Sequence, residues 1–140
     1  MIPSSDFPRL TVDNHRTTSP ATPNYNCIAW SAGDTEHWWQ PGVYWPIVSP
    51  KDEFGIESLT EAMQSIGFAI CETGALETGF QKVALYATSS FYTHTSRQLS
   101  SGKWTSKLGR MEDIEHDSHD DVAGRVYGSV VLFLKRQTPV

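Results

Sequence analysis

The sequence predicts an α+β fold, with N-terminal helices packed on a C-terminal antiparallel sheet of about four to five strands. Helix signals occur only before residue 67, strand-like runs dominate from residue 80 onward, and turn signals separate those runs. The 140 residues suit one domain, and a composition of 39% hydrophobic and 19% charged residues is that of a globular chain. We therefore expect residues 24–140 to form a single domain, preceded by an extended N-terminal arm over residues 1–23.

Two helices are expected in the first half of the chain. Asn24 or Asn26 can cap a helix that begins near Cys27, and Gly33 is a signal for its end. A longer amphipathic helix is expected over residues 56–66, because its apolar residues recur at helical spacing. These core-facing residues are Ile56, Leu59, Ala62, Met63 and Ile66.

Strands are expected in the second half. The strand-like runs are residues 68–71, 81–88, 91–99, 103–108 and 125–136. Ser100-Ser101-Gly102 fits a three-residue hairpin loop with glycine in the left-handed position. That loop places Leu99 opposite Lys103, and alternation along the two strands then puts His94 and Ser106 on one face.

Cys27 is the candidate nucleophile. The positive end of a helix dipole favours thiolate over thiol, and many cysteine nucleophiles are activated in this way. A cysteine nucleophile also needs a base, and His94 in the run over residues 91–99 is the best-placed histidine. A cysteine at an early helix start and a histidine on a later strand together indicate a Cys-His hydrolase.

A third group should orient the imidazole of His94. In the expected register Ser106 is its diagonal neighbour, and Asp113, just past the strand, is the other candidate. The oxyanion hole would use the backbone N–H of the cysteine and the side chain of Asn24 or Asn26. Both asparagines serve equally well as capping or turn residues, so two interpretations stay open for each.

Aromatic residues supply the candidate substrate-binding groups. Four of the five tryptophans lie between residues 30 and 45. They form a compact core that holds an irregular loop, an aromatic wall beside Cys27 that shapes a substrate cleft, or both, because the two interpretations are compatible. Trp30 follows the cysteine on its expected helix, and Trp104 shares the expected face of His94. We therefore take Trp30 and Trp104 as candidate substrate-binding residues.

Residues 115–121 contain the metal-ligand side chains His116 and His119 among several carboxylates. Their spacing matches no recognised zinc motif, and hard carboxylates dominate the segment. A solvated acidic loop is therefore favoured over a metal site, and no metal or cofactor is expected. A metal protein that uses these two histidines is the alternative.

Charge and hydropathy restrict the partners. The net charge of −5, without a basic stripe, argues against nucleic acid. The N-terminus has no signal-peptide pattern, and the longest apolar run, residues 130–134, is too short to cross a bilayer. These observations predict a cytoplasmic protein with reduced cysteines and no membrane partner. The expected partner is a small-molecule, peptide or protein substrate.

Five segments resemble a family of small bacterial proteins that carries a domain-of-unknown-function label. They are residues 25–30 (YNCIAW), 82–86 (KVALY), 94–99 (HTSRQL), 104–109 (WTSKLG) and 113–116 (DIEH). The resemblance runs from about residue 24 to the end of the chain, and it implies a bacterial origin without implying an activity.

The wider arrangement resembles the papain-like superfamily, including bacterial cell-wall peptidases and amidases of the NlpC type. This resemblance implies a papain-like fold with Cys27 as nucleophile, His94 as base and Ser106 as the third residue. The leading hypothesis is a cysteine hydrolase or acyltransferase, such as a peptidase, amidase or deamidase, that acts on an amide or (thio)ester. The alternative is a non-enzymatic module whose tryptophan-rich loop and His94 face bind a ligand or protein.

Overall fold

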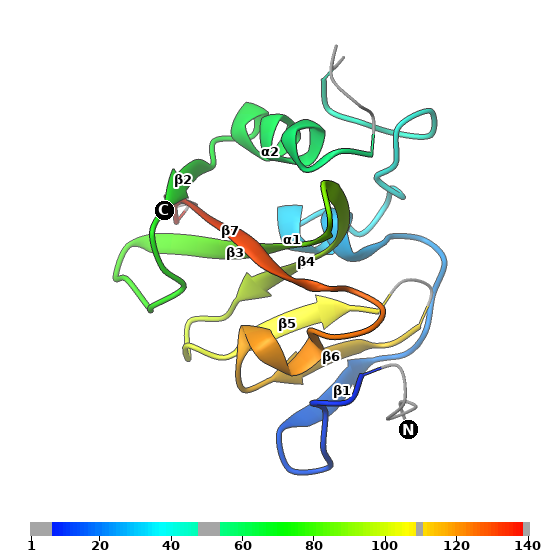
Figure 1. The fold of residues 1–140 in the computed structure, drawn as a ribbon, viewed down its shortest axis with the longest axis vertical. Coiled ribbons are helices and arrows are strands. Elements are labelled where there is room, and N and C mark those ends of the chain that lie inside the picture. Colours follow the sequence, from blue (N-terminus) through cyan, green and yellow to red (C-terminus); the bar gives the residue numbers. More distant parts are fainter. Residues whose placement is uncertain (1–6, 48–53, 109–110, 139–140) are drawn as a thin grey trace.

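One antiparallel sheet dominates the molecule (Figure 1). The computed structural model describes residues 7–47, 54–108 and 111–138. Within these ranges the seven strands are β1 His15–Ser19, β2 Ala69–Cys71, β3 Phe80–Thr88, β4 Phe91–Gln98, β5 Trp104–Lys107, β6 Asp113–His116 and β7 Ser129–Gln137. Their spatial order is β1-β6-β5-β4-β3-β7-β2, and every neighbouring pair is antiparallel. The described helices are α1 Cys27–Ala32, α2 Ile56–Ser65 and the 3-10 helix η1 His119–Val122.

The predicted α+β class, a papain-like packing of N-terminal helices on about four to five strands, is wrong. The described chain is mainly β, because seven strands form the sheet while α1 and α2 have only six and ten residues. The sequence did not predict β1 and β6, two neighbouring strands at one side of the sheet, so too few strands were expected. Their sequences, HRTTS and DIEH, lack the apolar alternation that indicates a strand.

β1 brings part of the N-terminal arm into the sheet. It pairs with β6 at the sheet edge, with His15 opposite His116 and Thr17 opposite Ile114. The side chain of Arg16 donates a hydrogen bond at 2.9 Å to the carboxylate of Glu115 on β6. Residues 15–19 therefore form an edge strand, and a side-chain hydrogen bond as well as backbone pairing joins it to β6.

The two α-helices begin at the residues that the sequence predicts, Cys27 and Ile56. Asn26 caps α1, because its Oδ1 accepts from the Ala29 backbone N–H at 3.1 Å, and Gly33 ends the helix in the left-handed conformation. The second predicted helix, residues 56–66, is confirmed as α2, which runs from Ile56 to Ser65. Among the described helices, none has the length and apolarity that crossing a bilayer requires.

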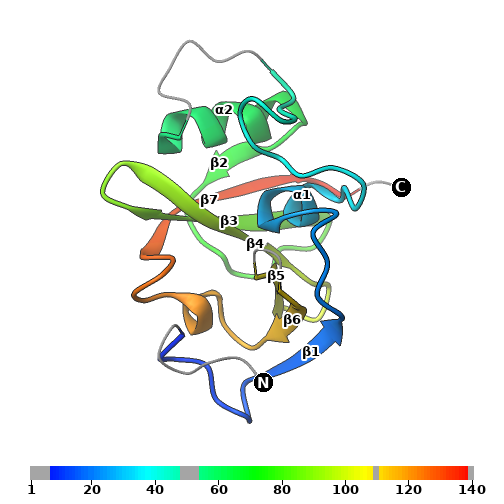
Figure 2. The ribbon, with the colours of Figure 1, turned by 90° about the vertical axis from the view of Figure 1, so that its right-hand side faces the viewer.

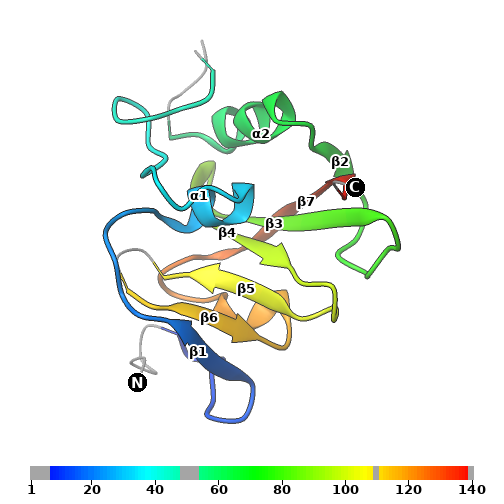
Figure 3. The same cartoon turned by 180° about the vertical axis from the view of Figure 1, so that it is seen from behind.

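The central strands of the sheet are covered on both faces. α1 and α2 lie on one face, and η1 lies on the other with the N-terminal segment (Figures 2 and 3). The core on the helix face includes Ile28, Ala29, Leu59, Met63, Val83, Leu85 and Leu134. The core on the η1 face includes Phe7, Leu10, Ala84, Tyr86, Trp104, Ile114 and Val122. Consecutive residues of β3 thus alternate between two cores, as strand geometry requires.

The predicted register of the hairpin formed by β4 and β5 is confirmed. Gln98 pairs with Trp104, and Arg97 pairs with Thr105. The backbone ladder between these described strands has only those two pairs, whereas β4 stays paired with β3 back to Phe91. Side chains must therefore connect β4 to β5 over the first half of β4.

Gly128 and Gly42 offer a matched test of backbone packing. Both have a left-handed φ, +70° and +87° respectively. A Cβ on Gly128 would lie 2.2 Å from the Ala87 carbonyl oxygen, whereas one on Gly42 would meet nothing within 4 Å. We expect Gly42→Ala to reduce the free energy of unfolding by about 1–2 kcal/mol, from the backbone conformation alone, and Gly128→Ala to reduce it by clearly more. Urea unfolding measures both, and equal losses would contradict the close approach at Gly128.

Candidate functional site

A cavity of about 220 Å³ opens at the start of α1, with Cys27 in its wall. In the described part of the chain, aromatic side chains dominate its lining, and they are Trp38, Trp39, Phe54, Tyr92 and Tyr127. Asn26, Gln40 and Thr93 add polar groups. The cavity therefore combines a thiol, an apolar wall and a few polar groups, which is the usual make-up of a small-ligand site.

Asn26 and Thr95 hold the helix start in place. The Asn26 Oδ1 accepts from the backbone N–H of Trp39 at 3.2 Å in addition to the capping bond, and its Nδ2 donates to the Trp39 carbonyl at 2.8 Å. The Cys27 carbonyl accepts from the Thr95 hydroxyl on β4 at 2.9 Å. Of the two interpretations of Asn26, these bonds favour capping, and they also attach Trp39 to the cavity wall.

The Cys27 thiol is buried, and this burial raises its pKa above the ordinary value. Hydrogen bonds from Thr95 and from the backbone at Ile28 act in the opposite direction but are outweighed. The expectation of a depressed pKa at the helix start is therefore wrong for this structure. α1 has six residues, so its dipole is weak, and loss of water around the sulfur dominates. Cys27 is a neutral thiol near pH 7.

His94 lies behind the cavity wall. Its ring is stacked on that of Tyr127, with centroids 3.9 Å apart and an interplanar angle of 6°, and Tyr127 lines the cavity. His94 is fully buried, and burial, with a smaller contribution from His116, lowers its pKa well below the ordinary value. Its Nδ1 has no hydrogen-bond partner among the described residues, so none joins it to Cys27.

The other ring nitrogen of His94 belongs to a buried polar cluster. Its Nε2 lies 3.0 Å from the Ser106 Oγ. The same Oγ lies 2.8 Å from the Ser96 Oγ and 2.7 Å from the His116 Nε2, and the Tyr86 hydroxyl lies 2.9 Å from Ser96. The contact between His94 and Ser106 that the register predicts is therefore present, and its catalytic role stays a prediction.

His116 is part of this cluster, although the sequence favours a solvated acidic loop over residues 115–121. It is fully buried, because β6 carries it into the sheet on the η1 face. Its Nε2 faces Ser106, and its Nδ1 donates to the Ser118 carbonyl at 2.8 Å. The loop interpretation is wrong for His116, and contacts with Ser106 and Ser118 occupy both of its ring nitrogens.

Besides His94 and Ser106, which lie behind the wall, three more predicted site residues do not line the cavity. Asn24 is exposed. Trp30 donates its indole N–H to the Thr105 hydroxyl at 3.0 Å and so packs along the sheet. Trp104 is buried in the core of the η1 face. The structure brings Asn26 and Cys27 together with the cavity, but it places these three side chains elsewhere.

Asp113, the alternative third residue, contacts a different partner. Its carboxylate accepts a hydrogen bond from the Tyr25 hydroxyl at 2.6 Å. Burial and this carboxylate raise the pKa of Tyr25 to about 12. Asp113 pairs with Lys107 on β5, so it faces the helix side of the sheet, whereas His94 faces the η1 side. Asp113 therefore orients Tyr25 and not His94.

Tyr92 and Tyr127 line the cavity, and the sequence did not indicate either one. Tyr92 lies beside a β-bulge in the pairing of β4 with β3, so simple alternation misplaces it. Tyr127 comes from the loop before β7, and its ring packs on those of His94 and Phe7, which are far away in sequence. Trp38 and Trp39 do line the cavity, in agreement with the aromatic-wall interpretation.

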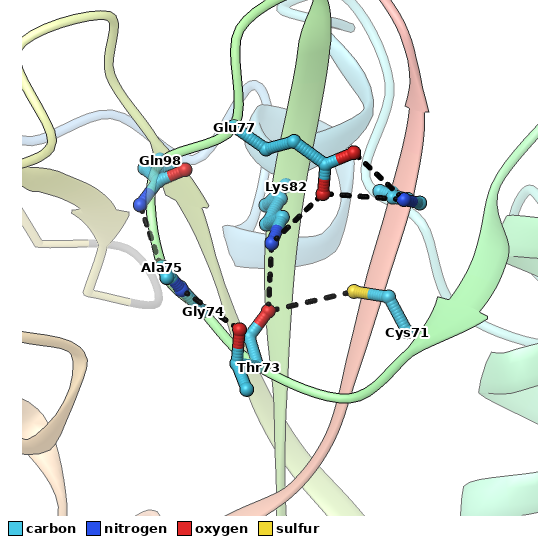
Figure 4. Close-up of polar contacts among 8 residues, drawn as sticks. Cys71, Thr73, Gly74, Ala75, Glu77, Lys82 and Gln98 are labelled. Carbon is cyan, nitrogen blue, oxygen red and sulfur yellow. Dashed lines mark hydrogen bonds and ion pairs between the residues drawn. The ribbon is translucent and has the colours of Figure 1, made fainter.

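A second cavity, of about 370 Å³, lies between β2, the loop that follows it, β3 and β7 (Figure 4). Lys82 donates to the Thr73 carbonyl at 3.0 Å and forms an ion pair with Glu77 at 3.4 Å. Lys135 forms a closer ion pair with the same carboxylate, at 2.9 Å, and lowers the pKa of Glu77. Because Glu77 pairs with both ammonium groups, we place the candidate site at the Cys27 cavity instead.

The raised pKa of Cys27 predicts a displaced titration. In a Cys71→Ser variant, where Cys27 is the only thiol, the iodoacetamide rate should rise with pH and reach its midpoint above the ordinary ~8.5, because the thiolate is the reactive form. Mass spectrometry across a pH series measures this rate, and the urea-unfolded variant gives the reference midpoint. A midpoint below the reference would contradict the effect of burial.

The two buried histidines make folding depend on pH. Burial lowers the pKa of both His94 and His116 in the folded chain, so below about pH 6.5 the unfolded chain binds more protons. We expect the free energy of unfolding to fall as the pH drops from about 7 to about 5, by up to ~1.4 kcal/mol per unit for each histidine. Urea unfolding measures the slope. A flat profile would contradict buried neutral rings.

Comparison with known proteins places the chain in a family. No curated protein and no solved structure matches it. A family model described as a domain of unknown function, DUF7689, matches residues 16–135. This range takes in most of the sheet, the Cys27 cavity and the His94 cluster, and the label agrees with the resemblance found in the sequence. The chain therefore belongs to the DUF7689 family.

Proposed function

We propose that this chain is a cysteine-dependent hydrolase or acyltransferase, in which Cys27 attacks an amide or (thio)ester carbonyl and His94 is the general base. One observation carries the proposal. Cys27 lines a cavity, and directly behind the wall of that cavity lies a fully buried imidazole whose Nδ1 has no partner among the described residues. Buried polar atoms without partners are rare in folded proteins, and a catalytic role is one physical explanation for such an atom.

The chemistry starts from a neutral thiol and a neutral imidazole. As the Cys27 sulfur attacks the carbonyl carbon, its proton passes to the His94 Nδ1, and the histidine then protonates the leaving group. Water or another acceptor attacks the thioester and regenerates the thiol. No hydrogen bond joins the two residues in the free protein, because Cys27 packs on the helix face of the sheet whereas His94 points to the η1 face behind Tyr127. The proposal therefore requires that substrate binding bring the two groups into contact. The proposal takes over the chemistry of papain-like hydrolases without their fold.

The backbone N–H of Cys27 is the proposed oxyanion donor. It belongs to the first residue of α1, where backbone N–H groups have no partner within the helix. The side chain of Asn26 contributes indirectly, because it caps the helix and holds Trp39 in the wall. Both cysteines are unpaired, which is the state expected in the cytoplasm, and we propose that compartment for the reaction.

The volume of the cavity limits the size of the acyl group that it can hold. Its volume of about 220 Å³ is below the roughly 300–1,000 Å³ of sites for drug-sized ligands. Aromatic rings form most of the wall, so we propose a substrate that inserts one short apolar side chain or acyl chain beside Cys27. The rest of the substrate would lie outside the cavity.

A chromogenic short-chain ester tests the proposal. We expect an initial burst of product and a mass increase on Cys27, because the acyl group stays on sulfur before water removes it. Cys27→Ala should abolish both signals. His94→Gln should slow acylation by about 10²–10⁴-fold, the usual contribution of a general base.

Cys71→Ser is the matched control, because it removes the other thiol and leaves the cavity unchanged, so it should keep the burst. Circular dichroism establishes that each variant is folded. An ester turnover that survives Cys27→Ala would exclude Cys27 as the nucleophile.

A binding module is the second candidate function, and the aromatic lining together with the raised pKa of Cys27 favours it. In that case Cys27 only packs against the ligand. Cys27→Ser would then keep ligand-induced changes in tryptophan fluorescence, and no acyl adduct would form with any ester, thioester or amide.

A further inference from the structure

We infer that Ser106 is a positioning residue that holds His94 in one tautomer, with the proton on Nε2 and a bare lone pair on Nδ1. The use of that lone pair as a base rests on the proposed function, but the tautomer itself does not. The inference comes from counting protons in the buried cluster, where each hydroxyl has one proton to donate. Two separate chains of hydrogen bonds end at Ser106, and each begins at a backbone carbonyl.

The first chain runs through His116. Its Nδ1 lies 2.8 Å from the carbonyl oxygen of Ser118, and a carbonyl can only accept, so the His116 proton is on Nδ1. The neutral ring then has a lone pair on Nε2, 2.7 Å from the Ser106 Oγ. Ser106 must donate its proton to satisfy that contact.

The second chain runs through Tyr86. Its hydroxyl donates to the carbonyl oxygen of His119, so its only proton is already used. The contact of Tyr86 with Ser96 therefore needs the Ser96 proton, and the contact of Ser96 with Ser106, at 2.8 Å, needs the Ser106 proton. This second series of hydrogen bonds therefore also requires Ser106 to donate its proton.

Ser106 thus faces two demands for one proton and receives none from either chain. Its 3.0 Å contact with His94 can form only if the His94 Nε2 donates. The opposite tautomer would withdraw a proton from this cluster and place it on Nδ1, where the described residues provide no acceptor. Because the ring of His94 is neutral near pH 7, its single proton belongs on Nε2.

The arrangement leaves Nδ1 as an acceptor in a fixed orientation. The ring is stacked on Tyr127 and meets the edge of Tyr86, with centroids 5.0 Å apart. Ser106 therefore performs the orienting role that an Asp or Asn performs in other Cys-His pairs, and two backbone carbonyls keep its hydroxyl in the accepting state toward His94.

Nitrogen-15 NMR of histidine-labelled protein reads the tautomer without any substrate. Long-range spectra of the wild type should show His94 protonated on Nε2 only, and His116 protonated on Nδ1. In Ser106→Ala the Nε2 proton loses its acceptor, so both tautomers of His94 should be populated. Ser106→Thr keeps the hydroxyl and should restore the wild-type pattern, which a purely steric effect at this site would not do.

Single and double variants test the two chains. Ser96→Ala and His116→Phe each remove one chain, and the other still demands the Ser106 proton, so each single variant should keep the Nε2 tautomer. The double variant frees that proton for His94, and both tautomers should appear. If the double variant does not fold, Tyr86→Phe with His116→Phe relieves the same demand more gently. Ser96 then no longer donates to Tyr86, so it can donate to Ser106 instead and leave the Ser106 proton for His94.

Two results would overturn the inference. One is a wild-type His94 protonated on Nδ1, and the other is a Ser106→Ala spectrum identical to that of the wild type. Failure of the proposed function is a separate outcome. If the tautomer is found as expected while ester acylation does not depend on Cys27, the positioning role stands and the hydrolase proposal is rejected.

Discussion

The Ser106 hydroxyl connects β4, β5 and β6 where β4 and β5 have no backbone pairing. β4 and β5 share only two backbone pairs, yet Ser106 on β5 contacts His94 and Ser96 on β4 and His116 on β6. Buried hydroxyls and imidazoles are costly unless they are hydrogen-bonded, by about 1–3 kcal/mol for each unsatisfied group. The cluster satisfies nearly all of them, so it stabilises this part of the sheet and restricts the orientation of His94.

Burial acts on the two candidate catalytic groups in a common way. It raises the pKa of the Cys27 thiol and lowers the pKa of the His94 imidazole, so the neutral forms of both are favoured. A preformed thiolate–imidazolium pair is therefore disfavoured in the free protein. The proposed chemistry resembles that of serine hydrolases in this respect, because the proton moves only as the nucleophile attacks.

The same chemistry on a different fold has a physical basis. Cys-His catalysis requires a nucleophile, a base and a group that orients the base, and several unrelated folds provide these three parts. Here the proposed nucleophile, Cys27, begins a six-residue helix, and β4 and β5 carry the proposed base His94 and its partner Ser106. The helix is short because Gly33 ends it, and it is held at its start by Asn26 and Thr95 rather than by length.

The sequence by itself determined both α-helices and the register of the β4–β5 hairpin. Asn26 and Gly33 delimit α1 through capping chemistry, the helical spacing of apolar residues identifies α2, and the hairpin loop sets Ser106 near His94. These features depend on residues close together in the chain, where backbone preferences and turn geometry dominate. The aromatic residues Trp38 and Trp39 were also foreseen beside the cysteine.

Only the tertiary structure decided the fold class, the placement of His116 and the lining by Tyr127. β1 and β6 are polar segments that become strands because each completes the hydrogen bonds of a neighbour, and local propensity does not encode such pairing. His116 is buried because β6 enters the sheet, and Tyr127 reaches the cavity through contact with a residue far away in sequence. The pKa of Cys27 rises for the same reason, since long-range packing and not the helix start removes water from its sulfur.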